Sequence, residues 1–182
     1  MPRSVCAIVL CLLVGAPALA ADEQVNVNFM YTLDHRADFS KIRGGPLQVD
    51  VFTDGRGVDN ANLLAPGYLA DKPLTDILRD ALVQGFTQGK AALVESDGKL
   101  RLEGNIESTQ VDMIDVNGVP SIQYTVRTRV KLQGSGRTMF QTVLFGRGAA
   151  PVADGIGAAV DAALGRTIRE LMQDDYFLNE II

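Results

Sequence analysis

The chain has 182 residues and a formal net charge of −5, from 17 lysines and arginines against 22 aspartates and glutamates. This acidic balance argues against binding nucleic acid or anionic lipid through the overall electrostatic field. Both cysteines, Cys6 and Cys11, lie in an N-terminal segment that we expect to be removed. The mature protein would then have no thiol, disulfide or thiolate metal site, and its length suits one domain over residues 21–182.

The first residues have the features of a signal peptide. Arg3 precedes an apolar run, Ala7–Val14, that is too short to span a bilayer. Ala18-Leu19-Ala20 is a small-x-small cleavage motif. We predict a signal peptide over residues 1–20, cleaved after Ala20, and a periplasmic product. We expect no transmembrane segment, and association with the outer membrane stays open.

The first half of the domain alternates between strand and helix patterns. Apolar and polar residues alternate over Val25–Leu33 and again over Leu47–Val51, which predicts two strands. Residues 54–67 are rich in Gly, Asp, Asn and Pro and predict a loop. A helix follows over residues 71–88, with Asp71 as its cap. Its apolar face comprises Leu74, Ile77, Leu78, Ala81, Leu82 and Phe86.

The second half predicts a three-strand meander and another helix. A strand over residues 100–116 leads into Asn117-Gly118, the favoured pair for a type I′ turn, and strict alternation follows to Gln133. A last strand covers Arg137–Gly146, and a helix runs from Pro151 to about Met172. The fold class is therefore α+β, an antiparallel sheet with helices on one face. The small residues of the second helix should let it lie close to that sheet.

The register of the first hairpin predicts a β-bulge. A two-residue turn puts Ile122 opposite Met113, apolar against apolar. Continued without a break, the pairing would bring polar residues of one strand against the core residues of the other. One extra residue within Glu107–Gln110 repairs this and aligns Thr128 with Ile106.

No catalytic, metal or cofactor site emerges from the sequence. His35 is the only histidine, and nothing marks a nucleophile or carboxylate beside it. The acids of residues 50–60 are spaced too widely for a calcium loop. The glycines of Gly85–Lys90 and Gly155–Gly157 complete no phosphate-binding pattern, and there is no Gly-x-Ser-x-Gly motif. We expect no cofactor.

A basic stripe runs along the polar face of the best-defined strand. It comprises Arg127, Arg129 and Lys131. The bulged register places Glu107 opposite Arg127 and Glu103 opposite Lys131, which favours a solvated face with ordinary ion pairs. Arg129 alone would lack a partner and is the candidate contact for an anion.

The last strand is apolar on both faces, which makes it the candidate partner surface. One set of side chains is Phe140 and Leu144, and the other is Met139, Val143 and Phe145. The preceding turn could hold two or three residues, so the sequence leaves open which set faces the helices. We expect the N-terminal segment Val25–Leu33 to cover the exposed set. The alternative is a partner protein or a second copy of this chain.

The order of these features resembles the YajG family, uncharacterised envelope lipoproteins of Gram-negative bacteria. The matching parts are Val49–Arg56 with its Asp-Gly-Arg loop, the helix Leu74–Gln88, the meander Arg101–Phe145 and the tail Leu171–Asp174. The resemblance implies an envelope protein with no established catalytic residues. Members usually carry a lipidated cysteine just after the signal. Here Cys11 lies inside the apolar run instead, so a soluble periplasmic product is expected.

These observations favour a non-enzymatic binding or accessory protein of the cell envelope. Its partner would be an envelope protein or another copy of the chain. One alternative is a carrier that holds a lipid or other amphiphile between helices and sheet. Another is a hydrolase whose site no sequence motif marks.

Overall fold

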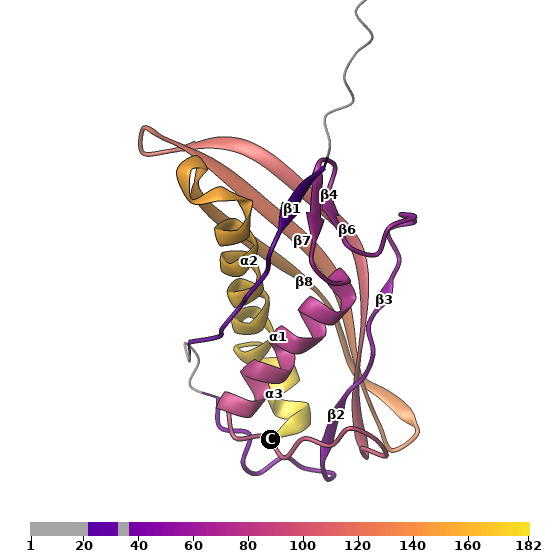
Figure 1. Ribbon diagram of the computed structural model, residues 1–182. Coiled ribbons are helices and arrows are strands. Elements are labelled where there is room, and N and C mark those ends of the chain that lie inside the picture. Colours follow the sequence, from indigo (N-terminus) through magenta and orange to yellow (C-terminus); the bar gives the residue numbers. More distant parts are fainter. Residues whose placement is uncertain (1–21, 33–36) are drawn as a thin grey trace, which may run out of the picture.

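The structure, a computed structural model, describes residues 22–32 and 37–182 (Figure 1). The predicted signal peptide with its cleavage site, and His35, lie outside these residues. Within the described ranges, no helix is both long and apolar enough to cross a membrane. The same ranges contain no cluster of three or more His, Cys, Asp or Glu side chains suited to a metal ion.

A five-stranded sheet forms the body of the protein. Its strands are β2 (Leu47–Val49), β3 (Thr53–Asp54), β6 (Leu100–Val116), β7 (Val119–Gly134) and β8 (Arg137–Pro151). They lie in the order β2-β6-β7-β8, with β3 pairing farther along β6. The β6–β7–β8 meander is antiparallel as predicted, whereas β2 and β3 run parallel to β6.

A second, three-stranded sheet involves part of the predicted loop. It comprises β1 (Glu23–Val25), β5 (Tyr68–Ala70) and β4 (Leu63–Ala65). The prediction of an irregular loop over residues 54–67 is therefore wrong at Asp54, which belongs to β3, and over Leu63–Ala65, which form β4. These strands have two or three residues each, too few for alternation to reveal them.

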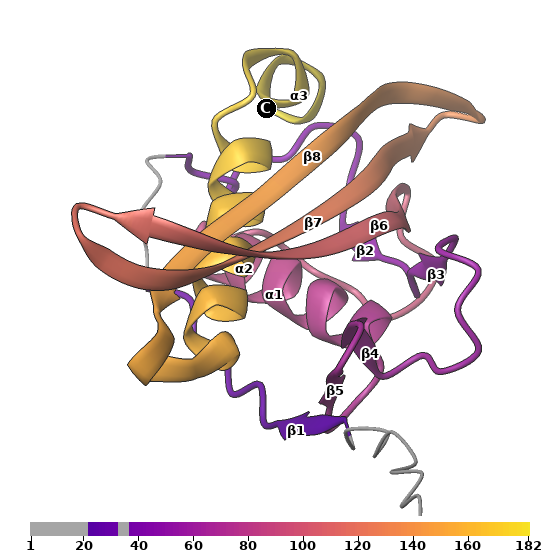
Figure 2. The same cartoon turned by 90° about the horizontal axis from the view of Figure 1, so that it is seen from above.

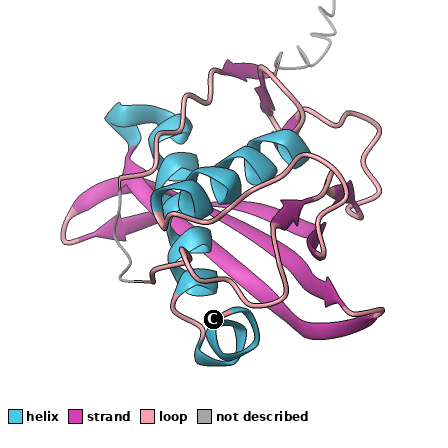
Figure 3. Cartoon of the chain, turned by 90° about the horizontal axis from the view of Figure 1, so that it is seen from below, coloured by secondary structure: helices cyan, strands magenta, loops and turns pink. Residues whose placement is uncertain are grey.

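The helices lie on one face of the five-stranded sheet, which confirms the α+β class (Figure 3). They are α1 (Leu74–Gln88), α2 (Gly155–Met172) and α3 (Asp175–Ile181), with a short 3₁₀ turn, η1 (Val152–Asp154), before α2. The opposite face of the β6–β7–β8 meander carries no helix and is turned toward the viewer in Figure 2. We call it the outer face.

Helix α1 buries its predicted apolar face, but its start differs from the prediction. Pro73 occupies the N-cap position and makes no side-chain capping bond. Asp71, predicted as the cap, instead accepts a hydrogen bond from the backbone N–H of Val27 at 3.1 Å. The carboxylate is thus engaged by the N-terminal segment rather than by the helix.

The predicted strand Val25–Leu33 is mostly not paired in a sheet. Only its start belongs to β1, and the following residues 26–32, here called the strap, lie against the helices. Gln84 on α1 accepts from Tyr31 N at 2.8 Å and donates to Phe29 O at 3.1 Å, and Gln88 donates to Tyr31 O. Side-chain amides thereby replace the backbone amides of a neighbouring strand. The alternation of apolar residues correctly predicted which side chains are buried, but not which groups their backbone forms hydrogen bonds with.

Replacing Gln84 with leucine should loosen the strap. The variant leaves the Tyr31 N–H and the Phe29 C=O without their partners, a loss of roughly 1–3 kcal/mol. Hydrogen exchange at Tyr31 should speed up, while exchange within β7 stays slow. Gln110→Leu is the matched control, because that amide donates to the surface carboxylate of Asp112. Unchanged exchange at Tyr31 would contradict the assignment.

The predicted β-bulge is confirmed. Ile106 pairs with Thr128 and Ser108 with Arg127, so Glu107 is the extra residue in β6. On the far side of the bulge, Met113 faces Ile122 as expected. The hairpin register therefore follows from its turn and from the position of this one residue.

The β6–β7 turn has the geometry expected of a type I′ turn. Asn117 has φ 54° and Gly118 has φ 83°. A Cβ added to Gly118 would meet no atom within 4 Å, so a substitution there strains only the backbone. We expect Gly118→Val to lower the free energy of unfolding by about 1 kcal/mol or more. Gly118→Asn should lower the free energy of unfolding less, because asparagine tolerates positive φ. Thermal melting of the two variants measures the difference.

The β7–β8 turn settles which apolar set of β8 faces the helices. It is a two-residue turn through Ser135 and Gly136, followed by a bulge between the pairs Gln133–Thr138 and Leu132–Phe140. Beyond the bulge the even-numbered side chains therefore point inward: Leu144 is in the core and Phe140 packs against it. Met139, at the bulge, also packs against the core.

Helix α2 lies very close to β8, as its small residues predicted. A Cβ on Gly148 would be 2.3 Å from both Ala159 O and Ala163 N. A Cβ on Gly146 would be 2.1 Å from the hydroxyl oxygen of Thr167. This part of the helix–sheet interface is therefore filled by backbone and leaves no room for a ligand.

Candidate functional site on the outer sheet face

A groove of about 600 Å³ lies on the outer face, between the segment that links β2 to β3 and the strands β6 and β7. It combines charged, polar and apolar side chains. Its lining residues are Asp50, Val51, Thr53, Arg101, Glu103, Gly104, Asn105, Arg129 and Lys131. The sequence prediction reached Arg129 and Lys131 through the basic stripe but did not place Val51 or Arg101 beside them.

A register break in the β2–β3 segment exposes Val51 at this groove. In β2, residues 47–49 pair with residues 100–102 of β6, and in β3, residues 53–54 pair with residues 105–106. The three residues between the two strands, 50–52, therefore lie beside only two residues of β6. Phe52 turns inward against Gly104, where a Cβ would lie 2.2 Å from its ring. Val51 is consequently 76% exposed. The prediction that Val51 continues the alternation of β2 is wrong for this reason.

One carboxylate at the β6 bulge neutralises two arginines. Glu107 lies 2.8 Å from Arg127 and 2.6 Å from Arg129. The prediction that Arg129 lacks a partner is therefore wrong: a bulged residue reaches both cross-strand neighbours. Lys131 faces Glu103 in register but forms no ion pair among those of the described residues. Because these side chains are partly exposed, each pair contributes under about 1 kcal/mol.

Arg101 and Asp50 form the ion pair on the β2 side of the groove, at 2.7 Å. The hydrogen bond and charge of Asp50 raise the pKa of the Arg101 guanidinium, so the cation stays charged at any physiological pH. Arg101 is half exposed and keeps donors free to face solvent.

Part of the predicted apolar patch borders the basic stripe. Val143 pairs with Arg129 and Phe145 with Arg127, whose guanidinium lies 5.4 Å from the centre of the Phe145 ring. Phe145 is 45% exposed. Only these two of the five predicted patch residues lie on the outer face, because Leu144 is in the core and Met139 and Phe140 pack against it. The strap does not cover them, since its backbone bonds to α1 on the other side of the sheet.

We use the name outer-face site for the cations and apolar side chains that share this surface. Its members are Val51, Arg101, Arg129, Lys131, Val143 and Phe145. The described residues bring no nucleophile and base together here. Exposed cations beside apolar side chains are instead suited to bind a ligand that is both acidic and apolar.

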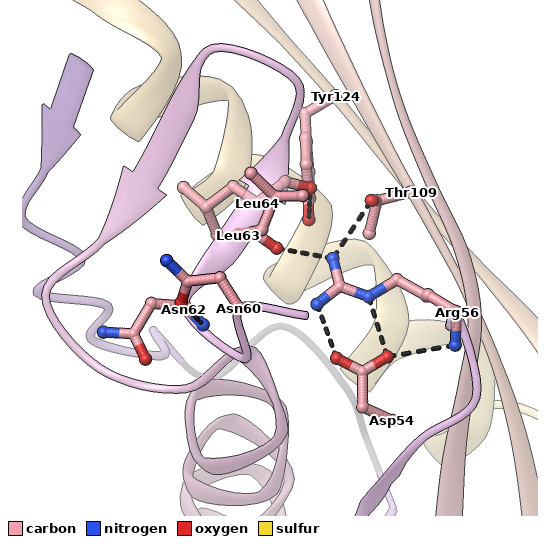
Figure 4. A network of polar contacts seen from close by, with 8 residues as sticks. All are labelled: Asp54, Arg56, Asn60, Asn62, Leu63, Leu64, Thr109 and Tyr124. Atoms are coloured by element: carbon pink, nitrogen blue, oxygen red, sulfur yellow. Dashed lines mark hydrogen bonds and ion pairs between the residues drawn. The ribbon is translucent and has the colours of Figure 1, made fainter. Parts of the chain in front are cut away.

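The Asp-Gly-Arg loop, by contrast, forms a buried structural network (Figure 4). Arg56 binds both carboxylate oxygens of Asp54 and also donates to Leu63 O and Thr109. Its side chain is only 4% exposed and that of Asp54 is 18% exposed. Hydrogen bonds from Arg56 hold the pKa of Asp54 below its usual value, and burial raises the pKa of nearby Tyr124. This ion pair fastens the β3–β4 loop to β6.

Comparisons with known proteins establish the fold. A scan against protein-family models and a search of curated proteins gave no match. A solved structure from Xanthomonas campestris, described by the family DUF330, is similar at a TM-score of 0.62 and 18% identity, over 82% of this chain and 92% of that chain. A minor lipoprotein from Acinetobacter baumannii is more distant, with a TM-score of 0.47, 6% identity and coverage of 78% and 96%. The likeness to the Xanthomonas campestris structure shows a shared α+β fold.

Proposed function

We propose that the protein is a non-enzymatic accessory protein of the bacterial envelope that uses its outer-face site to bind an acidic, partly apolar protein segment. The observation that carries the proposal is a local excess of cations in an acidic chain, since the four cations of this surface, Arg127 included, lie among three carboxylates, Asp50, Glu103 and Glu107. Arg101, Arg129 and Lys131 gather on the sheet face that lacks a helix, beside the exposed Val51 and Phe145. Arginine and aromatic side chains are enriched where proteins meet proteins.

The envelope location rests on the predicted signal peptide and on the resemblance to envelope lipoproteins. We propose that export ends with cleavage after Ala20 and leaves a periplasmic protein. N-terminal sequencing of protein from its host should begin at Ala21 or Asp22. A product that retains Cys6, or that carries a lipid, would contradict this.

Neither alternative function has a specific observation in its favour. A carrier would need space between helices and sheet, but backbone atoms of α2 fill the region over Gly148. A hydrolase would need a nucleophile aligned with a base, and the outer-face site contains neither.

Photo-crosslinking in the host tests the proposed function. A photoreactive residue at Val51, and separately at Phe145, should give adducts with the same protein. Lys131→Glu and Arg129→Glu should each abolish the adduct. Arg166→Glu is the control, because it makes the same charge change at an exposed position of α2. An adduct that survives charge reversal in the site would refute the proposal.

A further inference from the structure

The β6–β7 hairpin projects past the first turn of α2 (Figures 1 and 2). Near its turn, Val116 pairs with Val119, and these side chains are 41% and 47% exposed. Alternation places Asp112 and Ile114 on the same outer face as Val116. We call Asp112, Ile114, Val116 and Val119 the hairpin tip. No described element covers its valines.

The hairpin tip is acidic as well as apolar. Residues 108–126 contain two carboxylates, Asp112 and Asp115, and no lysine or arginine. Asp112 accepts a hydrogen bond from Gln110, and no ion pair involves it among those of the described residues. The tip is therefore complementary to the outer-face site, which joins cations to the exposed Val51.

The hairpin tip of one chain cannot reach Arg101 and Lys131 of its own outer-face site. The tip and these cations lie on the same face of the same sheet, and about ten residues of β6 separate Glu103 from Asp112 and Val116. At roughly 3.3 Å per residue, the separation is on the order of 30–40 Å. The tip can therefore reach these cations only on another molecule.

We propose that the outer-face site receives the hairpin tip of a second copy of this chain, in a closed, twofold-symmetric dimer. The hairpin tip and the cations of the outer-face site lie toward opposite ends of the same sheet face. When two copies pack outer face against outer face with their β6 strands antiparallel, each tip therefore lies over the other copy's site. Every contact is then made twice, as in isologous dimers. Asp112 approaches Lys131 and Arg101, and Val116 packs on Val51. Val143 and Phe145 lie between the two contacts. This inference rests on the proposed function, because it names the acidic segment that the site binds.

Sedimentation velocity of the purified mature chain tests the dimer. In about 50 mM salt the wild type should sediment as a dimer, and about 0.5 M salt should weaken it because these charges are partly exposed. Asp112→Lys and Lys131→Asp should each weaken dimerisation at least about tenfold, because each places like charges together. Asp76→Lys, an equal change at an exposed position of α1, should leave the dimer intact. Asp115 is unsuitable for substitution because it accepts a hydrogen bond from Gly118 N in the turn.

A charge swap separates direct contact from general charge effects. The double variant Asp112→Lys with Lys131→Asp should dimerise again, and a mixture of the two single variants should form the mixed dimer. Melting curves check that every variant is folded. A monomeric wild type, unchanged dimerisation in the single variants, or a monomeric double variant would each overturn the proposal. A monomeric wild type with a charge-dependent Val51 adduct in the host would leave the proposed function standing.

Discussion

Replacing Gly148 with valine is expected to destabilise the protein by about 3 kcal/mol or more, because it forces α2 away from the sheet. The new Cβ would lie 2.3 Å from backbone atoms of Ala159 and Ala163, and backbone cannot rotate aside as a side chain can. Separation would also open the apolar interface that α2 shares with β7 and β8. Denaturant unfolding measures the loss.

Gly165→Ala is the matched control, with the opposite expected sign. Gly165 lies within α2, and a Cβ there would meet only the end of the Arg169 side chain, at 3.7 Å. Alanine in a helix interior is favoured over glycine by roughly 1 kcal/mol, so this variant should be slightly more stable. A Gly148→Val variant as stable as the wild type would show that α2 does not dock as described.

Replacing Arg56 with methionine should destabilise the protein by about 3–5 kcal/mol. The variant leaves the carboxylate of Asp54 largely buried without its counter-ion, and it removes the donor to Leu63 O. Because α1 and the meander do not depend on this pair for their own hydrogen bonds, the β3–β4 loop should open first. Urea unfolding and hydrogen exchange across residues 53–65 measure the two effects.

The effect of Arg56→Met should depend on pH. The depressed pKa of Asp54 means that its ion pair stabilises the fold fully above the ordinary aspartate value of 3.8, and this stabilisation is lost as pH falls through the depressed folded pKa. The difference between wild type and variant should therefore shrink in acid. Adding Asp54→Asn should recover part of the loss at neutral pH. A pH-independent difference would mean that packing, rather than charge, explains the effect.

The meander could be predicted because its signals are local and mutually consistent. Asn117-Gly118 fixes the turn, and the alternation of β7 fixes which residues face the core. Together they require one extra residue near Glu107. The apolar face of α1 followed from spacing in the same way. These features depend on neighbours in sequence, which a sequence displays directly.

The parts that could not be predicted depend on distant partners. The strap looked like a strand because alternation reports burial, whereas its hydrogen bonds come from Gln84 and Gln88 on a helix. Val51 broke its pattern because Phe52 had a better place against Gly104. The outer-face site combines residues from the β2–β3 segment, β6, β7 and β8, so only the stripe on β7 was visible in the sequence.

The single residue at the β6 bulge also determines how the strand can vary in length. Before Glu107 the even-numbered side chains of β6 face the core, and after it the odd-numbered ones do. The bulge therefore shifts the inward–outward alternation by one residue between the two halves of the strand. The turn sets the alternation of one half, and the core contacts of Leu102 and Ile106 set that of the other. Deleting Glu107 itself would close the bulge and join the pairs Ile106–Thr128 and Ser108–Arg127 in one continuous register, so the strand has one residue to spare. A second deletion in the same stretch would turn either Val111 or Ile106 away from the core, so it should be far less tolerated than deletions in the β3–β4 loop.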